Sequence, residues 1–334
     1  MRALVFTAPE TLEIQEVDPP RPRRDQTLVE VALCGICGSD MHAWHGHDAR
    51  RVPPMILGHE GVGVAASGPF AGKRVAINPL MTCGRCSFCV SGRSHLCRHR
   101  EMIGMRMPGA FAEEVIVATR NLTILPDDLP FGRAVLAEPL ACATHAVGLA
   151  LRHQRALGGG TEAVVLGGGA IGLLSALVLR AKGVSPIHIA ETNARRRAAL
   201  EVLFPGAVYD PADPAYDSLR ADMVLDAVGT GRTRAAASRI VAPGGVIMHI
   251  GLQDNADGLD TRRLTLQEVA FMGAYCYLPQ DFATAIEMLR DRTIDPAGWS
   301  TLRDLGEGAA CFAEIDAGEA PAKLILQVSE TADA

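Results

Sequence analysis

A glycine-rich loop between a strand-like run and a helix-like run constrains the fold of this chain most strongly. Gly167, Gly169 and Gly172 fit the pattern G-x-G-x-x-G, directly after an apolar run at 163–166. Glu191 ends the next strand-like run, 24 residues after Gly167. Glycines at these places allow a tight turn, close approach of a pyrophosphate, and close packing of helix on strand. The pattern therefore predicts a parallel, doubly wound α/β sheet that binds a dinucleotide.

The residues after this loop bear on which dinucleotide binds. A carboxylate at Glu191 would accept hydrogen bonds from the ribose hydroxyls and repel a 2′-phosphate, so we expect NAD rather than NADP. The basic run Arg195-Arg196-Arg197 lies just downstream. An arginine can accommodate a 2′-phosphate, so NADP stays open as the alternative. A glycine-rich turn without a ligand is disfavoured, because strand, loop, helix and acid follow in the order that binding requires.

The organisation of the chain follows from where its patterns change. Strand-like and helix-like runs alternate from residue 163 to residue 274, which is typical of a parallel sheet covered by helices. The first 117 residues instead carry short strand-like runs separated by Pro and Gly. We therefore predict an α/β protein with two domains. Residues 1–140 and 280–334 form a β-rich domain, and residues 141–279 form a Rossmann domain.

Composition excludes several classes of function. The 334 residues carry a net charge of -6, which argues against a nucleic-acid partner because such proteins present basic surfaces. No apolar run reaches the ~18 residues of a membrane span, so we expect no membrane partner. The first residues enter a strand-like pattern and lack a signal-peptide cleavage region. Four of the nine cysteines cluster at metal-like spacing, which favours a cytoplasmic location and metal thiolates over disulfides.

The clustered cysteines predict a structural metal site within a lobe at about 80–100. Cys83, Cys86, Cys89 and Cys97 follow C-x2-C-x2-C-x7-C. Four thiolates at this spacing can close a tetrahedron around Zn2+ and leave no open position for a substrate. An iron–sulfur cluster is the chemical alternative, because cysteines separated by two residues also suit one.

A second group of residues predicts a catalytic zinc site. Cys37 and His59 supply a thiolate and an imidazole, and a catalytic zinc usually takes three protein ligands. Glu60 and Glu138 both qualify as the third ligand, and the sequence does not choose between them. Asp40 is placed to orient His59 through its other ring nitrogen. Ser39 and His42 could pass a substrate proton to solvent, which completes the catalytic candidates Cys37, Ser39, His42, His59 and Glu60.

Taken together, these motifs resemble the zinc-containing medium-chain dehydrogenase/reductase family, within the alcohol dehydrogenase superfamily. The similarity covers nearly the whole chain and is closest to the sorbitol-type polyol dehydrogenases and the L-threonine 3-dehydrogenases. The motifs that carry it are C-G-I-C-G-S-D-M-H at 34–42, G-H-E at 58–60, the cysteine quartet, and A-E-P-L at 137–140. The resemblance implies a GroES-like β-rich catalytic domain, a Rossmann domain, and homodimers or homotetramers.

The resemblance also assigns roles to residues. It implies catalytic zinc ligands at Cys37, His59 and either Glu60 or Glu138, and a proton relay through Ser39 and His42. Glu191 and Arg196 resemble the pair that binds the adenosine ribose. The cofactor-binding candidates as a set are Gly167, Gly169, Ile171, Gly172, Glu191, Arg196, Val228 and Ile250.

These observations predict a zinc-dependent oxidoreductase that transfers a hydride between a secondary alcohol or polyol, or the matching ketone, and NAD. Each subunit is expected to hold one catalytic and one structural zinc ion. The alternatives are an NADP(H)-preferring zinc reductase and an enzyme like L-threonine 3-dehydrogenase. From a different class, a metal-binding or regulatory homologue could keep the fold without turnover. The intact set Cys37, Ser39, His42 and His59 argues against that last interpretation.

Overall fold

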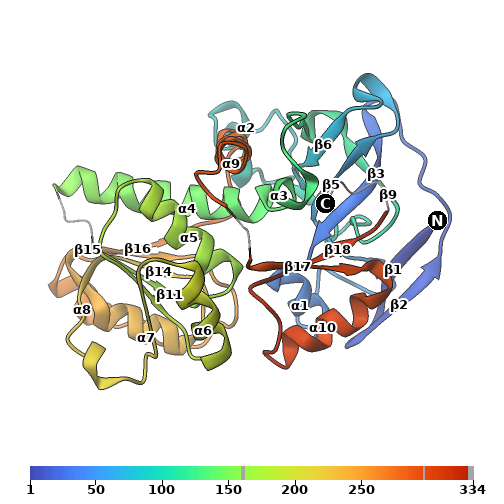
Figure 1. Cartoon of the computed structure of the whole chain (residues 1–334). Helices are drawn as coiled ribbons and strands as arrows, with labels where there is room; N and C mark the ends of the chain where they lie inside the picture. Colours follow the sequence, from blue (N-terminus) through green and yellow to red (C-terminus); the bar gives the residue numbers. More distant parts are fainter. Residues whose placement is uncertain (159–161, 296–297, 330–334) are drawn as a thin grey trace. The chain divides into compact units, whose positions relative to one another are not determined.

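The computed structural model describes residues 1–158, 162–295 and 298–329. The chain divides into two units, coloured by sequence in Figure 1. Unit 1 comprises Met1–Glu138 and Leu278–Ala334, and unit 2 comprises Pro139–Tyr277. Residues 330–334, which the expected first domain included, lie outside the described residues.

Unit 1 is built mainly of short strands. Its largest sheet has the order β10-β6-β5-β3-β18-β17, with β9 also pairing with β3. Its strands are β1 (Arg2–Ala8), β2 (Thr11–Glu16), β3 (Gln26–Gly35), β4 (Met55–Ile56), β5 (Glu60–Ala65), β6 (Arg74–Ile77), β7 (Leu80–Met81), β8 (Glu101–Met102), β9 (Glu114–Ala118), β10 (Leu122–Ile124), β17 (Ser300–Asp304) and β18 (Lys323–Gln327). Its helices are α1 (Gly38–Trp44), α2 (Ser87–Val90), α3 (Phe131–Ala134), α9 (Pro279–Arg290) and α10 (Gly308–Asp316), with 3-10 turns η1 (Gly68–Phe70), η2 (Ser94–Leu96), η3 (Thr119–Asn121) and η5 (Leu305–Glu307).

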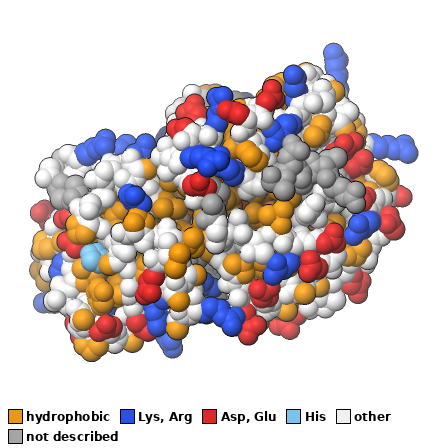
Figure 2. Space-filling model, viewed as in Figure 1, with side chains coloured by type: hydrophobic (Ala, Val, Ile, Leu, Met, Phe, Trp, Pro, Cys, Tyr) orange, Lys and Arg blue, Asp and Glu red, His pale blue; other side chains and the backbone are white. Residues whose placement is uncertain are grey.

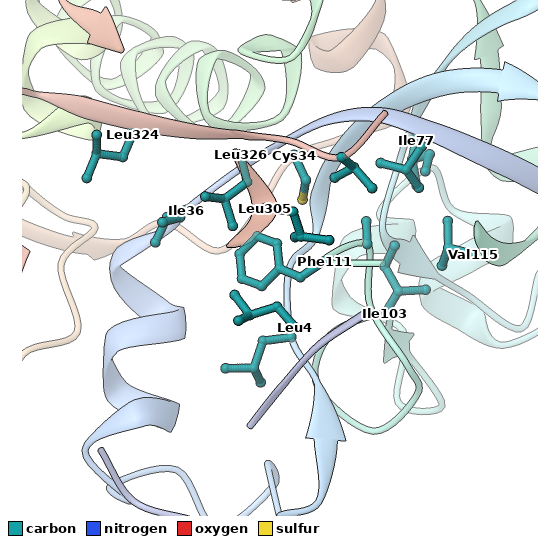
Figure 3. Close-up of a cluster of buried hydrophobic side chains, with 14 of the residues drawn as sticks. Leu4, Cys34, Ile36, Ile77, Ile103, Phe111, Val115, Leu305, Leu324 and Leu326 are labelled. Atoms are coloured by element: carbon teal, nitrogen blue, oxygen red, sulfur yellow. The ribbon is translucent and has the colours of Figure 1, made fainter. Parts of the chain in front are cut away.

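The last strand, β18, places the end of the described chain inside the sheet of unit 1. It pairs antiparallel with the end of β3, where Leu326 lies opposite Cys34. Figure 3 shows Leu4, Phe111, Leu305 and Leu326 converging on one buried cluster from separate parts of the chain. Burial of each such side chain contributes about 1.5–3 kcal/mol. The core of unit 1 therefore fixes the place where β3 ends and the Cys37 segment begins.

Unit 2 is a parallel sheet of order β13-β12-β11-β14-β15-β16 covered by helices. Its strands are β11 (Ala163–Leu166), β12 (Ile187–Ala190), β13 (Ala207–Tyr209), β14 (Ala221–Asp226), β15 (Val241–His249) and β16 (Ala270–Gly273). Its helical segments are α5 (Ala170–Ala181), α6 (Ala194–Leu203), η4 (Pro214–Tyr216), α7 (Gly231–Ile240) and α8 (Thr261–Leu266), and α4 (Ala137–Leu157) starts at the unit boundary. Every residue of β11 is buried, as expected for a strand covered on both faces. The predicted α/β class with a Rossmann sheet is confirmed.

One local expectation fails at Pro139, which the sequence suggested would separate two helices. The structure instead places Pro139 in the first turn of α4, and α3 ends before it at Ala134. A proline in the first turn costs no hydrogen bond, because the N–H groups there have no partner within the helix. Proline therefore sits just inside the start of α4 rather than between the two helices.

The stretch Phe131–Arg155 is long and apolar enough to cross a membrane by length and composition alone, but 78% of its most apolar window is buried in the structure. A buried core helix can meet the same criteria of length and composition. On the face shown in Figure 2, side chains of both charges are interspersed with apolar ones.

Candidate active site

The Cys37 segment is shaped by its own hydrogen bonds at the start of α1. Cys37 precedes the helix, and its backbone N–H donates to Asp40 Oδ2 at 3.0 Å. Asp40 is fully buried. Its carboxylate therefore fixes the main chain that carries Cys37 and turns its other oxygen inward.

That other oxygen faces His59. Asp40 Oδ1 lies 3.4 Å from His59 Nδ1, and both side chains are buried. Burial disfavours the charged forms of both the His59 ring and the Asp40 carboxylate, but the attraction between the two charges outweighs it. The pKa of His59 is therefore raised and the pKa of Asp40 is lowered. Because Nδ1 faces Asp40, Nε2 is the nitrogen left for a metal. This is the arrangement of a metal-bound histidine held by a carboxylate.

Cys37, His59 and Glu60 come together as one ligand set. One sulfur, nitrogen or oxygen atom from each lies within 4.8 Å of the others. Glu60 is 1% exposed, and its Oε1 has no hydrogen-bond partner in the part of the chain that the structure describes. A thiolate, an imidazole and a carboxylate oxygen suit zinc, and three protein ligands leave one position for a substrate. The residues present therefore fit a catalytic zinc ion.

Lys323 is the member of this site that the sequence analysis missed. Its ammonium forms an ion pair with Glu60 and donates to Ile36 O at 2.7 Å. Burial disfavours the charge, but the negative charges of Glu60, Cys37 and Glu138 outweigh that and raise the pKa of Lys323. A lysine that begins the apolar run Leu324-Ile325-Leu326 was the available signal. Glu138 is 6% exposed and acts on the same ammonium.

Gly35 makes room for this ion pair. A Cβ atom there would overlap the carboxylate of Glu60 and lie 2.8 Å from Lys323 Cε. The glycine at the end of β3 is therefore required by close approach of side chains.

Of the predicted relay residues, Ser39 lies in the first turn of α1 and His42 in its last turn. His42 is partly buried, and burial, with the charges of His47 and Arg51, lowers its pKa despite opposition from Asp48. Arg51, which the sequence analysis also missed, donates from Nη2 to Ser39 Oγ at 3.2 Å. Ser39 thus has a cationic neighbour that no spacing rule indicated.

The cysteine quartet forms a separate cluster in unit 1. Sulfur–sulfur distances are 3.5 Å for Cys86–Cys89, 3.8 Å for Cys86–Cys97 and 3.9 Å for Cys83–Cys89. Four sulfurs each about 2.3 Å from a central zinc would be about 3.8 Å apart, whereas a disulfide requires about 2.05 Å. The short helix α2 and the 3-10 turn η2 lie within the loop that carries the four cysteines. The cluster thus fits a closed structural zinc site.

In unit 2 the glycine loop joins β11 to α5. Gly167 has a φ of 94°, and a Cβ there would overlap Val228. A Cβ on Gly172 would overlap the carbonyl of Gly167. Gly169 precedes the first turn of α5, and Ile171 lies within that turn, beside the N–H groups available to a phosphate.

The other cofactor candidates gather at the same edge of the sheet. Val228 follows the end of β14 and Ile250 follows the end of β15, and Ile250 N donates to Asp226 O at 2.9 Å. Parallel strands present their carboxyl ends at one edge, which is where doubly wound sheets bind ligands. The structure thus brings these two residues to the edge that carries the glycine loop.

Glu191 is held against that loop. Its Oε2 accepts from Gly168 N at 2.8 Å and lies 3.2 Å from Arg196 Nη1. Arg197 is engaged elsewhere, because it donates to the carbonyl of Glu191 and pairs with Asp210 at 2.8 Å. Two of the three arginines of the basic run are therefore already paired.

Unit 1 also contains a cavity of about 560 Å3 lined by residues of the segments 49–56 and 105–108, which include Met55, Met105 and Met107. Arg51 lies within the first segment and donates from Nε to Gly104 O at 2.8 Å, and Gly104 directly precedes the second segment. The arginine that contacts Ser39 thus binds the main chain next to the cavity wall.

Comparisons with known proteins agree with this chemistry. Residues 23–127 match the family described as alcohol dehydrogenase GroES-like domain, and residues 170–291 match the family described as zinc-binding dehydrogenase. The chain is 30% identical to 2-dehydro-3-deoxy-L-galactonate 5-dehydrogenase of Pseudoalteromonas atlantica, over 98% of each chain. This chain belongs to the zinc-containing alcohol dehydrogenase superfamily.

Further relatives of this alcohol dehydrogenase show the same relationship. It is 28% identical to sorbitol dehydrogenase of Halalkalibacterium halodurans, over 98% of this chain and 100% of the other. A Sinorhizobium meliloti protein described as a zinc-binding dehydrogenase, solved bound to NADP, superimposes with a TM-score of 0.86 at 26% identity, over 98% of both chains. The predicted family, the GroES-like and Rossmann fold, the zinc dependence and the NAD(P)-linked oxidation of secondary alcohols are confirmed.

Proposed function

We propose that this alcohol dehydrogenase oxidises a secondary hydroxyl of a polyol or of a related sugar acid, with NAD as the hydride acceptor. The observation that carries the proposal is the cluster of the partly buried Cys37 with the buried His59 and Glu60, which offers three ligands to one zinc ion. The named relatives that act on sorbitol and on a galactonate derivative support a polyhydroxylated substrate.

Residues of unit 1 would bind the metal and move the proton. Cys37, His59 and Glu60 would hold the zinc, with Asp40 fixing the His59 ring and Lys323 balancing the charge of Glu60. When bound, zinc supplies Lewis acidity that lowers the pKa of the substrate hydroxyl. The alcohol loses one hydride and one proton; the proton passes to Ser39 and then to His42, whose lowered pKa keeps it neutral and able to accept.

Glu60 is the preferred third ligand, with Glu138 as the alternative. Glu60 shares the 4.8 Å ligand cluster and has a carboxylate oxygen without a hydrogen-bond partner among the described residues. Glu138 is buried close enough to act on Lys323. Glu60→Gln should therefore weaken zinc binding more than Glu138→Gln.

The cofactor would lie on unit 2, with NAD preferred. Gly167, Gly169, Ile171 and Gly172 would receive the pyrophosphate, and Val228 and Ile250 would lie beside the nucleotide. Glu191, held by Gly168 N and paired with Arg196, would accept the ribose hydroxyls. The pairing of Arg196 and Arg197 leaves less positive charge for a 2′-phosphate, which supports NAD over NADP.

We also propose a homodimer or homotetramer in the cytoplasm. β16 is an edge strand of the parallel sheet, and Phe271 on it and Leu266 nearby are 39% and 72% exposed, so pairing with a second copy would cover them. No disulfide joins any two of the nine cysteines, all of which lie in the described residues, and this supports a reducing compartment. Light scattering of the purified protein would give the subunit number.

The test is a substrate screen combined with metal analysis. NAD reduction is measured with polyols, sugar acids, simple secondary alcohols and 3-hydroxy amino acids, and the best substrate is compared with NADP. Cys37→Ser should abolish turnover while the fold and the zinc of the quartet remain. A wild-type metal content near one per subunit, with no turnover on any substrate, would instead support the regulatory alternative. Best activity on L-threonine would support an enzyme like L-threonine 3-dehydrogenase. Best activity with NADP would support an NADP(H)-preferring zinc reductase.

A further inference from the structure

Arg51 is a buried cation with its donors committed to specific partners. The residue is 3% exposed. Its Nε donates to Gly104 O at 2.8 Å, and its Nη1 donates to Ser39 O at 3.1 Å and to Asp48 Oδ2 at 2.7 Å. Its Nη2 donates to Ser39 Oγ at 3.2 Å and lies 3.9 Å from Asp40 Oδ1. Four of the five guanidinium N–H groups thus have a hydrogen-bond acceptor, and the contact with Asp40 is an ion pair at longer range.

The contact with Ser39 Oγ has a fixed direction. A guanidinium only donates hydrogen bonds, so Ser39 Oγ accepts from Arg51. The single proton of the hydroxyl must therefore point away from Arg51. One lone pair of Oγ remains free to accept a proton from a substrate. The bond from Nη1 to Ser39 O holds the main chain of the same residue.

The same guanidinium faces the carboxylate behind His59. Asp40 Oδ1 lies 3.4 Å from His59 Nδ1 and 3.9 Å from Arg51 Nη2. Arg51 therefore stands between the hydroxyl that would move the proton and the carboxylate that orients a candidate zinc ligand. A shift of Arg51 would alter both.

We propose that Arg51 is a positioning residue for proton transfer. By donating to Ser39 Oγ, Arg51 keeps one side of that oxygen as a hydrogen-bond acceptor and directs the hydroxyl proton of Ser39 toward the relay. This inference rests on the proposed relay function of Ser39. It differs from a purely structural role, in which Arg51 would only join the segment 48–52 to Gly104 and brace the loop. Both roles would lower stability on mutation, so the test must separate them.

The separating experiment is a double-mutant cycle of Arg51→Met and Ser39→Ala. Each single variant and the double variant are measured for kcat and KM, with the substrate that the screen ranks first. If Arg51 acts through Ser39, Arg51→Met should lower kcat by about 10- to 100-fold with little change in KM. The double variant should then be no slower than Ser39→Ala alone, because neighbours in one network are not additive. If the double variant instead lost kcat by the product of the two single-variant factors, the proposal would be overturned.

Arg74→Met is the matched structural control. Arg74 is a partly buried arginine of unit 1 that donates to the carbonyls of Pro126, Asp127 and Leu129 and contacts neither Ser39 nor Asp40. Its loss should lower stability while kcat and the solvent deuterium isotope effect stay as in the wild type. Arg51→Met should change that isotope effect, because proton transfer becomes slower. An unchanged isotope effect in Arg51→Met would count against the proposal.

Two further measurements keep the outcome clear. Arg51→Lys keeps the buried charge but cannot reach Gly104 and Ser39 with one planar fork, so it should fold and still lose about 10-fold in kcat. Wild-type kcat in Arg51→Lys would overturn the proposal. Zinc content should stay at the wild-type value in both Arg51 variants, and a parallel loss of zinc would assign the effect to the metal site instead. If Ser39→Ala itself retains full activity, the proposed relay fails rather than the placement of Arg51.

Discussion

Lys323, at the start of the last strand, forms a buried ion pair with Glu60, the residue that follows the candidate zinc ligand His59. The two side chains are 2% and 1% exposed, so neither charge is shared with solvent. The strand pairing between β18 and β3 brings the lysine there. The charge balance of the candidate metal site thus depends on a strand from the far end of the sequence.

The first prediction concerns this pair. Lys323→Met should lower the free energy of unfolding of the metal-free protein by about 3–5 kcal/mol, because it leaves the Glu60 carboxylate buried without a cation. Zinc supplies a replacement positive charge, so the loss should be smaller in the zinc-loaded protein. Urea unfolding with and without a chelator measures both values.

Lys73→Met is the control for the ion pair. Lys73 is exposed, so its loss should change stability by no more than about 0.5 kcal/mol. Equal losses for Lys323→Met with and without zinc would argue that Glu60 does not approach the metal.

The second prediction concerns pH. Histidine accepts a proton only when neutral, and burial lowers the pKa of His42 below its ordinary value of about 6.5. At neutral pH His42 should therefore be neutral and the rate of alcohol oxidation independent of its titration, and the rate should fall only as the pH drops through that lowered pKa. His42→Gln should remove this acid limb from the kcat/KM profile and lower the rate at pH 7 by about 10- to 100-fold. A variant that keeps the same acid limb would show that another group causes it.

The third prediction concerns cofactor choice. Glu191→Gln keeps an oxygen that can accept from Gly168 N but removes the negative charge. The preference for NAD over NADP, as a ratio of kcat/KM values, should fall by about 10-fold or more, because the repulsion of a 2′-phosphate is lost. Glu201 is an exposed residue of α6, the helix that follows Glu191 in the chain, and Glu201→Gln should leave the ratio unchanged. An unaltered ratio in Glu191→Gln would remove the basis for preferring NAD.

The fourth prediction concerns the quartet. Cys89→Ser should reduce zinc from about two ions to about one per subunit, because a tetrahedral site rarely survives the loss of a thiolate. The segment 83–97 should then become sensitive to proteases, since the metal holds a loop with little regular structure. Cys311→Ala, in the core of unit 1, should keep both ions. Elemental analysis that found iron in place of zinc would restore the iron–sulfur alternative.

The sequence was most informative where chemistry depends on short spacing. The quartet could be predicted because its ligands lie within one loop, and the glycine loop because strand, turn and helix follow one another directly. It was least informative about Arg51 and Lys323. A single arginine in a loop or a single lysine in a strand has no pattern, and its partners, Ser39 and Glu60, are identified only when the chain is folded. The misplaced break at Pro139 arose because a proline permits a helix start as readily as it ends a helix.

By itself, the sequence predicted the family, the dinucleotide fold of unit 2 and candidate ligands for two zinc sites, because these predictions depend on short motifs of residues close together in the chain. The sequence already predicted Asp40 beside His59, but only the tertiary structure decided which distant charged residues surround the candidate ligands and relay. It placed Lys323 against Glu60 and Arg51 against Ser39. Buried charges require partners at a few ångströms, and strand pairing and loop packing bring those partners from separate parts of the chain.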